Sequence, residues 1–366
     1  MFGRLFGKRP ASDAEVERLR SQAATAAADG RGADARSALE RAVTLAPERA
    51  DLLVELGERC LADGDAARAA AVFAAARAVA RGAEATLRAQ WGAAAARARL
   101  APVTDAAPGP ARAVPRDAPL VSVVICSIDP LRFERVVANF RARLGPVRHE
   151  IVGIHDARSL CEGYNRGIAN SRGEVIVFAH DDIRIVSPDF AAKLFAGLAE
   201  ADILGVAGTT LLCSPVWGRA GWPHLAGQVA HPDAGGRPVV TLYGLQAPLV
   251  PEVQALDGLF FAARRAALER VRFDAETFDG WHFYDLDFTF SAYLAGLRLA
   301  VRADLLVWHD SPGRYDERWQ RYAERFVHKH RADLTLWGGE AAGSNKVRVA
   351  MPAEAEWIAL AGHLWD

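Results

Sequence analysis

Hydrophobic positions in the first hundred residues recur at helical spacing. Residues 13–100 consist mainly of Ala, Arg, Leu and Glu, a composition that favours α-helices, and Pro47 is their one proline. The pair Leu56-Gly57 recurs as Trp91-Gly92 after 35 residues, with small residues at helical spacing between them. The pattern predicts an all-α region built from a repeated pair of helices.

Beyond residue 118 the pattern changes to short apolar runs that alternate with amphipathic segments. Runs of β-branched and other apolar residues predict strands over 120–126, 150–154 and 175–179, and the segments between them predict helices over 131–144 and 159–170. This alternation implies parallel strands joined by right-handed crossovers. We therefore predict an α/β domain with a mostly parallel central sheet.

Composition sets the expected domain boundaries. Residues 1–12 are basic and predicted to be a flexible N-terminus, and 13–100 form the helical repeat domain. Residues 101–118 are rich in Pro and Ala and are predicted to be a linker. The α/β domain is expected over 119–335, followed by a C-terminal extension over 336–366.

The charge, the cysteines and the lengths of the apolar runs argue against nucleic-acid binding and against a transmembrane protein. The 366-residue chain is 51% hydrophobic and 24% charged with a formal net charge of −1, so it has no basic field for nucleic acid. Its four cysteines form no CxxC pair, and no apolar run reaches the ~18 residues of a transmembrane helix. We expect a cytoplasmic protein. The alternative is peripheral contact of its basic N-terminus with the inner face of a membrane.

Two adjacent carboxylates, Asp181 and Asp182, follow the buried strand predicted over 175–179. Ligands of open α/β sheets gather beyond the carboxyl ends of such strands. A site that keeps two neighbouring carboxylates ionised ordinarily supplies a cation, and oxygen ligands suit Mg²⁺ or Mn²⁺. The pair indicates a metal site that holds a diphosphate; the alternative is an acidic loop that begins a turn.

Several short motifs occur in a specific order over residues 120–331. The first strand ends at Ser127, the second ends before Asp156, and the segment 165–174 precedes the acidic pair. The segments 257–265 and 278–287 follow. Together they resemble the inverting family 2 glycosyltransferases of the GT-A fold. The resemblance implies transfer of a sugar from a nucleotide-diphosphate sugar, most simply a UDP-sugar, to an acceptor hydroxyl.

The same resemblance implies roles for individual residues. Asp182 and His309 are implied as ligands of Mn²⁺ or Mg²⁺, and Asp285 as the general base. Asp287 is a second candidate acid, although a helix that begins here would turn it to another face than Asp285. The residues implied in donor binding are Ser127, Asp129, Asp156, Asn165, Arg166 and Asp181. Those implied in the acceptor or sugar pocket are Asp257, Trp281 and His282.

Two positions depart from the pattern of that family. His180 stands where the family has the first acid of an acid-any-acid triplet, and Tyr284 stands where relatives often have Glu before the base. These departures keep a second function open, a non-catalytic scaffold with a degenerate sugar- or nucleotide-binding domain. A third is a sugar nucleotidyltransferase, but the first strand is followed by no Gly-rich phosphate loop.

The middle copy of the helical region has Leu56-Gly57, a turn at Gly64, and then Ala69, Phe73 and Ala76 at helical spacing. It resembles the tetratricopeptide repeat. The resemblance implies a surface for protein partners, and it suggests that the repeat recruits a protein acceptor. A lipid-linked or polysaccharide acceptor is the alternative, and an Ala-rich bundle that only packs on the next domain is the alternative for the repeat itself.

Overall fold

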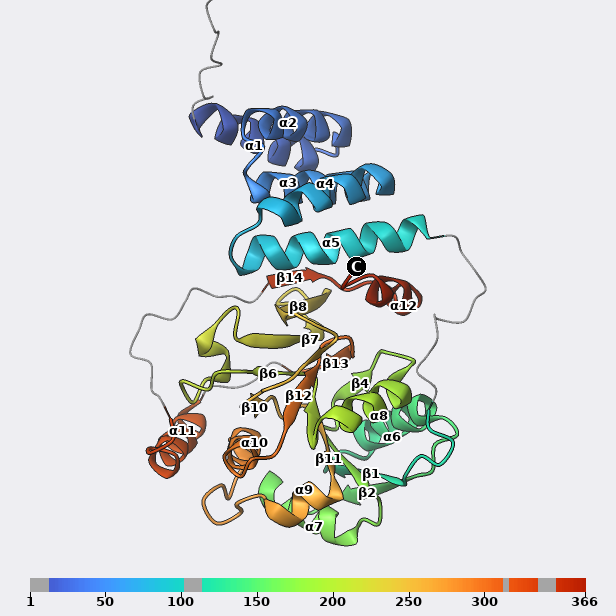
Figure 1. Ribbon diagram of the computed structural model, residues 1–366, viewed down its shortest axis with the longest axis vertical. Coiled ribbons are helices and arrows are strands. Elements are labelled where there is room, and N and C mark those ends of the chain that lie inside the picture. The colour runs from blue at the N-terminus through green and yellow to red at the C-terminus, as the bar shows by residue number, and fades with distance from the viewer. Residues whose placement is uncertain (1–12, 102–113, 312–315, 335–346) are drawn as a thin grey trace, which may run out of the picture. The chain divides into compact units, whose positions relative to one another are not determined.

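The computed structural model describes residues 13–101, 114–311, 316–334 and 347–366 (Figure 1). They divide into two compact units. One unit contains the described part of residues 1–106 together with residues 359–366, and the other contains the described part of 107–358. The N-terminus expected over 1–12 and most of the linker expected over 101–118 lie outside the described residues.

The first unit is all-helical, and each helix packs on the next one along the chain. Phe73 is fully buried in its core, between two glycines. A Cβ atom at Gly57 or Gly92 would lie only 2.7 or 2.3 Å from the Phe73 ring, so the absence of side chains lets the two helices that carry these glycines approach it. The five helices are α1 (Asp13–Ala28), α2 (Gly32–Leu45), α3 (Ala50–Ala62), α4 (Ala66–Val79) and α5 (Ala83–Leu100).

The end of the chain packs on this helical unit. The Gln90 side chain donates a hydrogen bond of 2.7 Å to the carbonyl oxygen of Leu364, and Arg77 donates one of 2.7 Å to that of Asp366. Leu364 is fully buried. The last residues of the predicted C-terminal extension are therefore part of the helical unit.

The second unit is built on a mixed central sheet with strand order β2-β1-β3-β11-β5-β12-β9. Strand β1 pairs in parallel with β2 and β3, and β5 pairs in parallel with β12, while β11 and β9 run antiparallel to their neighbours. The strands are β1 (Val121–Cys126), β2 (His149–Ile154), β3 (Val175–Ala179), β5 (Ile203–Gly205), β9 (Leu249–Val250), β11 (Phe260–Arg264) and β12 (Leu299–Arg302).

A second sheet, with order β10-β6-β7-β13-β4, carries β8 on β7 and β14 on β8. Strand β14 comes from the predicted C-terminal extension, so this segment completes a sheet of the α/β unit. The strands are β4 (Ile183–Ile185), β6 (Ala207–Thr209), β7 (Leu225–Pro232), β8 (Pro238–Gly244), β10 (Ala255–Leu256), β13 (Val307–His309) and β14 (Val347–Ala350).

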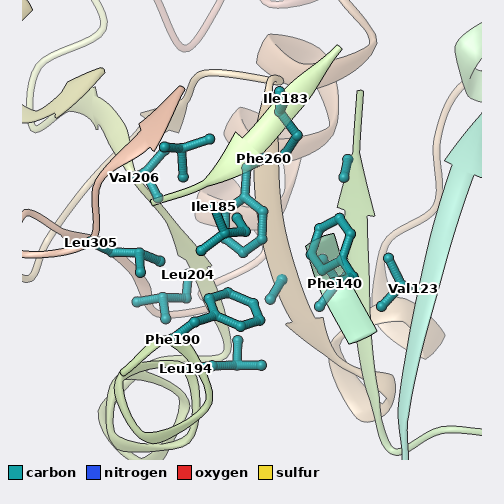
Figure 2. Close-up of a cluster of buried hydrophobic side chains, with 14 of the residues drawn as sticks. Val123, Phe140, Ile183, Ile185, Phe190, Leu194, Leu204, Val206, Phe260 and Leu305 are labelled. Carbon is teal, nitrogen blue, oxygen red and sulfur yellow. The ribbon is translucent and has the colours of Figure 1, made fainter. Parts of the chain in front are cut away.

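Helices cover the central sheet and bury its apolar side chains. Phe140 of α6 and Phe190 of α8 pack edge to face with ring centroids 6.0 Å apart, and Phe190 packs on Phe260 of β11 in the same way (Figure 2). The helices are α6 (Pro130–Leu144), α7 (Leu160–Asn170), α8 (Phe190–Glu200), α9 (Arg265–Arg270), α10 (Tyr284–Leu294), α11 (Glu317–Lys329) and α12 (Glu354–Gly362), with a 3₁₀ turn at Trp217–Ala220.

The predicted fold class is confirmed, since an all-helical region precedes an α/β domain. The strands and helices expected between residues 120 and 179 begin and end within one residue of the observed ones. Among the described helices, none combines the length and the apolar character that crossing a membrane requires.

Candidate active site

The turn after β3 carries the acidic pair and places it beside β13. His180, Asp181 and Asp182 link β3 to β4, and β4 pairs antiparallel with β13 so that His309 faces Ile183. The backbone N–H of Asp310 donates a hydrogen bond of 3.0 Å to the carbonyl oxygen of Asp182. Sheet register therefore brings His309 to Asp182 across more than a hundred residues of sequence.

Three side chains converge at this turn. The separations are 3.4 Å between His180 Nδ1 and His309 Nε2, 3.8 Å between His180 Nδ1 and Asp182 Oδ1, and 3.4 Å between His309 Nε2 and Asp182 Oδ1. Imidazole nitrogens and a carboxylate oxygen are common ligands of divalent transition metals. This group could bind a metal ion, and it includes both of the predicted ligands.

Electrostatic contacts in this group favour an ionised Asp182. Burial opposes ionisation of Asp182, but its contacts with His309 and the Ser311 hydroxyl hold its pKa well below the ordinary value. Ser311 Oγ donates a hydrogen bond of 2.6 Å to Asp182 Oδ2. Burial alone would lower the pKa of His309, yet the contact with Asp182 and its charge raise it. The His180 pKa is lowered by burial and by His309.

Tyr284, the first residue of α10, connects this group to the predicted general base. Its hydroxyl lies 2.5 Å from His180 Nε2. A Cβ atom on Gly258 would come within 2.2 Å of the Tyr284 hydroxyl and 2.7 Å of the Asp285 Cβ, so a residue without a side chain is required there. His180 and Tyr284, the two positions that the sequence analysis set apart, are thus in direct contact.

Asp285 follows Tyr284 and lies close to Asp257. The backbone N–H of Gly258 donates a hydrogen bond of 2.8 Å to Asp285 Oδ2. Burial, and next the negative charge of Asp257, raise the pKa of Asp285 from 3.8 to about 7. Two carboxyl groups that share a poorly solvated site cannot both ionise easily, so Asp285 exchanges its proton near neutral pH.

Asp287 points to a different neighbour. It is buried, with its carboxylate 2.9 Å from Lys329 Nζ and 2.8 Å from His330 Nε2. Lys329 also donates to Asp274 at 2.8 Å. Asp287 therefore attaches α10 to the end of α11, while Asp285 lies beside Asp257, as expected for two helical residues that do not share a face.

Of the six residues expected to bind the donor, three lie together at the carboxyl ends of β1 and β3. Ser127 Oγ donates a hydrogen bond of 2.7 Å to Asp181 Oδ2 and lies 3.0 Å from the carbonyl oxygen of Asp129. The Asp129 carboxylate caps α6 by accepting from the backbone N–H of Leu131 at 2.9 Å. Arg132 of α6 approaches Asp181 to 4.0 Å.

The other three are engaged elsewhere. Asp156 is exposed and forms an ion pair with Arg166, 2.6 Å between Oδ1 and the guanidinium. Asn165 donates a hydrogen bond of 2.8 Å to the carbonyl oxygen of Phe273, so its amide links α7 to the segment around Phe273. The amide oxygen of Asn165 is buried and has no hydrogen-bond partner.

In the expected acceptor region, Trp281 and His282 precede α10. Trp281 is 48% exposed, and His282 Nε2 lies 3.8 Å from Asp316, the residue that caps α11. Sequence reasoning assigned no role to Ser311 or to the Tyr284 hydroxyl. The position of Ser311 two residues after His309 was the available signal, because alternate residues of an extended segment share a face.

This arrangement defines a class, namely an α/β domain of GT-A-like fold with a group that could bind a metal at its strand ends. Residues 122–330, more than half of the chain, match the model of a glycosyltransferase-like family. The chain belongs to this family, and its α/β unit is a glycosyltransferase family 2-like domain. Among curated proteins, none matches the sequence significantly.

Solved structures resemble the chain only remotely. One is the mannosyltransferase PcManGT from Pyrobaculum calidifontis in complex with GDP-Man and Mn²⁺, with 16% identity, a TM-score of 0.38, and coverage of 74% of this chain and 76% of that one. Another is TarS 1-349 from S. aureus, with 15% identity, a TM-score of 0.34, and coverage of 58% and 72%.

Proposed function

We propose that the α/β domain is a metal-dependent, inverting glycosyltransferase that moves a sugar from a nucleotide-diphosphate sugar to an acceptor hydroxyl. One observation carries the proposal. Tyr284 contacts His180 of the group that could bind a metal, and the next residue, Asp285, has a carboxyl pKa near 7. The group that would bind the leaving diphosphate through a metal and the residue that would accept the proton are thus connected through Tyr284. The domain that contains them belongs to a glycosyltransferase-like family.

The chemistry assigned to the residues follows from this arrangement. Asp182 and His309 would hold Mn²⁺ or Mg²⁺, which when bound neutralises the charge that grows on the departing diphosphate. Asp285 would take the proton from the acceptor hydroxyl as that oxygen attacks the anomeric carbon, and a pKa of about 7 suits a general base at neutral pH. Burial maintains that pKa, and the charge of Asp257 adds to it.

We further propose that the donor nucleotide, most simply that of a UDP-sugar, binds where Ser127, Asp129 and Asp181 meet. Hydroxyl and carboxylate groups in this position can accept hydrogen bonds from ribose and base edges. Asp156, Arg166 and Asn165 stay candidates at the edge of this region. The exposed indole of Trp281, with His282 beside it, provides an apolar face of the kind on which a pyranose ring stacks. Asp287 is assigned to positioning α11.

We infer that the helical unit is a tetratricopeptide-like repeat that recruits a protein acceptor or partner, with a glycan acceptor as the alternative. The support is the packing of consecutive helices on one another. Gly57 and Gly92, which are 35 residues apart, face the Phe73 ring from the helix before it and the helix after it. Helices that each pack closely on their sequence neighbours are typical of stacked helical repeats. A cytoplasmic location, with peripheral membrane contact as an option, also stays a prediction.

Release of nucleotide from a panel of UDP-, GDP- and dTDP-sugars with Mn²⁺ or Mg²⁺ tests the catalytic proposal. We expect slow release with at least one donor, and we expect it to disappear in Asp182→Ala and Asp285→Asn. A matched control is Asp233→Asn, because Asp233 bonds only within its own turn between β7 and β8 in the interactions described. Donor binding without release under any condition would favour the scaffold, and pyrophosphate production from a nucleoside triphosphate would favour a nucleotidyltransferase.

A further inference from the structure

His180 and Tyr284 contact each other, with 2.5 Å between His180 Nε2 and the Tyr284 hydroxyl. We propose that His180 is the third protein ligand of the metal, that Tyr284 is a positioning residue that orients its ring, and that the site consequently prefers a divalent transition ion to Mg²⁺. This inference deepens the proposed function and rests on it for the identity of the site. It adds a ligand and a source of metal selectivity that the resemblance to the family does not supply.

The spacing of the donor atoms suits a single ion. His180 Nδ1, Asp182 Oδ1 and His309 Nε2 form a triangle with sides of 3.4, 3.8 and 3.4 Å. A metal about 2.1 Å from each donor spans such a triangle. All three atoms are close enough to share one ion without a change of side-chain rotamer, and the remaining Asp182 oxygen accepts from Ser311, as ligand carboxylates commonly do.

The contact with Tyr284 occupies one nitrogen of His180 and leaves the other facing Asp182 and His309. A neutral imidazole carries one N–H, and its other nitrogen has the lone pair that binds a metal. Nε2 lies 2.5 Å from the Tyr284 hydroxyl, which can accept from Nε2–H, while Nδ1 faces Asp182 and His309. The tyrosine is buried at the start of α10 and stays in place because its ring packs on Tyr164, with 5.7 Å between centroids.

Ligand chemistry then determines the choice of ion. Mg²⁺ is a hard cation that prefers oxygen ligands and retains its waters, whereas Mn²⁺ and the later first-row ions also accept imidazole nitrogen. An acid at position 180 would contribute an oxygen instead. With His180 in that position, two of the three protein donors are nitrogens, which disfavours Mg²⁺.

Binding of metal to the full chain, measured without any donor sugar, tests the proposal. Free Mn²⁺ is followed by electron paramagnetic resonance, and Mg²⁺ affinity comes from competition against Mn²⁺. We expect His180→Ala to weaken Mn²⁺ binding at least tenfold and Tyr284→Phe to weaken it about 10- to 100-fold, the range typical of groups that orient a ligand. His180→Asp is expected to narrow the preference for Mn²⁺ over Mg²⁺ about tenfold or more.

The matched control is His149→Ala, because His149 is half-buried and contacts only the Val147 carbonyl in the interactions described. It should leave Mn²⁺ affinity unchanged. The double variant His180→Ala/Tyr284→Phe should bind Mn²⁺ no more weakly than His180→Ala, because an orienting group has no effect without its ligand. A thermal melt without metal verifies that each variant is folded.

Two outcomes would overturn the inference. One is unchanged Mn²⁺ affinity in folded His180→Ala, and the other is additive losses in the double variant, which would make Tyr284 merely structural. Failure of this inference can be distinguished from failure of the proposed function. If nucleotide release is lost in Asp182→Ala but His180→Ala binds Mn²⁺ normally, only the role of His180 as third ligand is refuted. If Mn²⁺ binding depends on His180 but no donor sugar is turned over, only the transferase activity is refuted.

Discussion

The raised pKa of Asp285 predicts that an active-site substitution should stabilise the protein. The pKa is about 7 in the folded chain against an ordinary 3.8. At about 1.4 kcal/mol per pKa unit, the ionised carboxylate costs the folded state on the order of 4 kcal/mol above pH 7. Asn has nearly the same shape and can still accept from the Gly258 N–H, but it carries no charge. Asp285→Asn should therefore raise the free energy of unfolding.

The sign of the pH dependence follows from proton binding. Between pH 3.8 and 7 the folded chain retains a proton that the unfolded chain has lost, so this group makes the wild type less stable as pH rises. Below pH 3.8 both states hold the proton and the penalty is absent. The advantage of Asp285→Asn should thus grow by about 2 to 3 kcal/mol between pH 5 and pH 8.

Urea unfolding followed by tryptophan fluorescence at both pH values measures this difference. The matched control is Asp287→Asn, two residues along the same helix, because Asp287 is buried between Lys329 and His330. Asp287→Asn removes the buried negative charge that both Lys329 and His330 contact and should destabilise by roughly 3 kcal/mol. Nucleotide release should fall about 10²- to 10⁴-fold in Asp285→Asn. An advantage of the same size at pH 5 and pH 8 would refute the assigned electrostatics.

Three further outcomes are expected. Nucleotide release should rise with pH, with its midpoint near pH 7 and its plateau about one pH unit higher, because the base must be ionised. Asp257→Asn should move that rise to lower pH, because it removes the charge that adds to burial in raising the pKa of Asp285; an unmoved profile would contradict this. Gly92→Ala should destabilise the helical unit by about 1 to 3 kcal/mol in urea unfolding, because its Cβ would lie 2.3 Å from the Phe73 ring, while donor hydrolysis by the α/β unit continues. Removal of divalent ions with EDTA should abolish nucleotide release and added Mn²⁺ should restore it; full activity in EDTA would exclude the metal-dependent mechanism.

Local patterns in the sequence predicted the first half of the α/β domain closely. The apolar run of β3 and the amphipathic segment of α6 have lengths and periods that are typical of a buried strand and a surface helix. The acidic pair after β3 could be placed at a strand end for the same reason. The resemblance to a family added Asp285 and His309, whose own surroundings carry no comparable local signal.

The sequence by itself determined the helical and α/β regions and the acidic pair after β3, because periodicity and strand ends are properties of neighbouring residues. Only the tertiary structure decided which candidates meet. The pairing of β4 with β13 joins Asp182 to His309, and the start of α10 brings Tyr284 to His180. Such contacts depend on register and packing between segments about a hundred or more residues apart, so no local pattern encodes them.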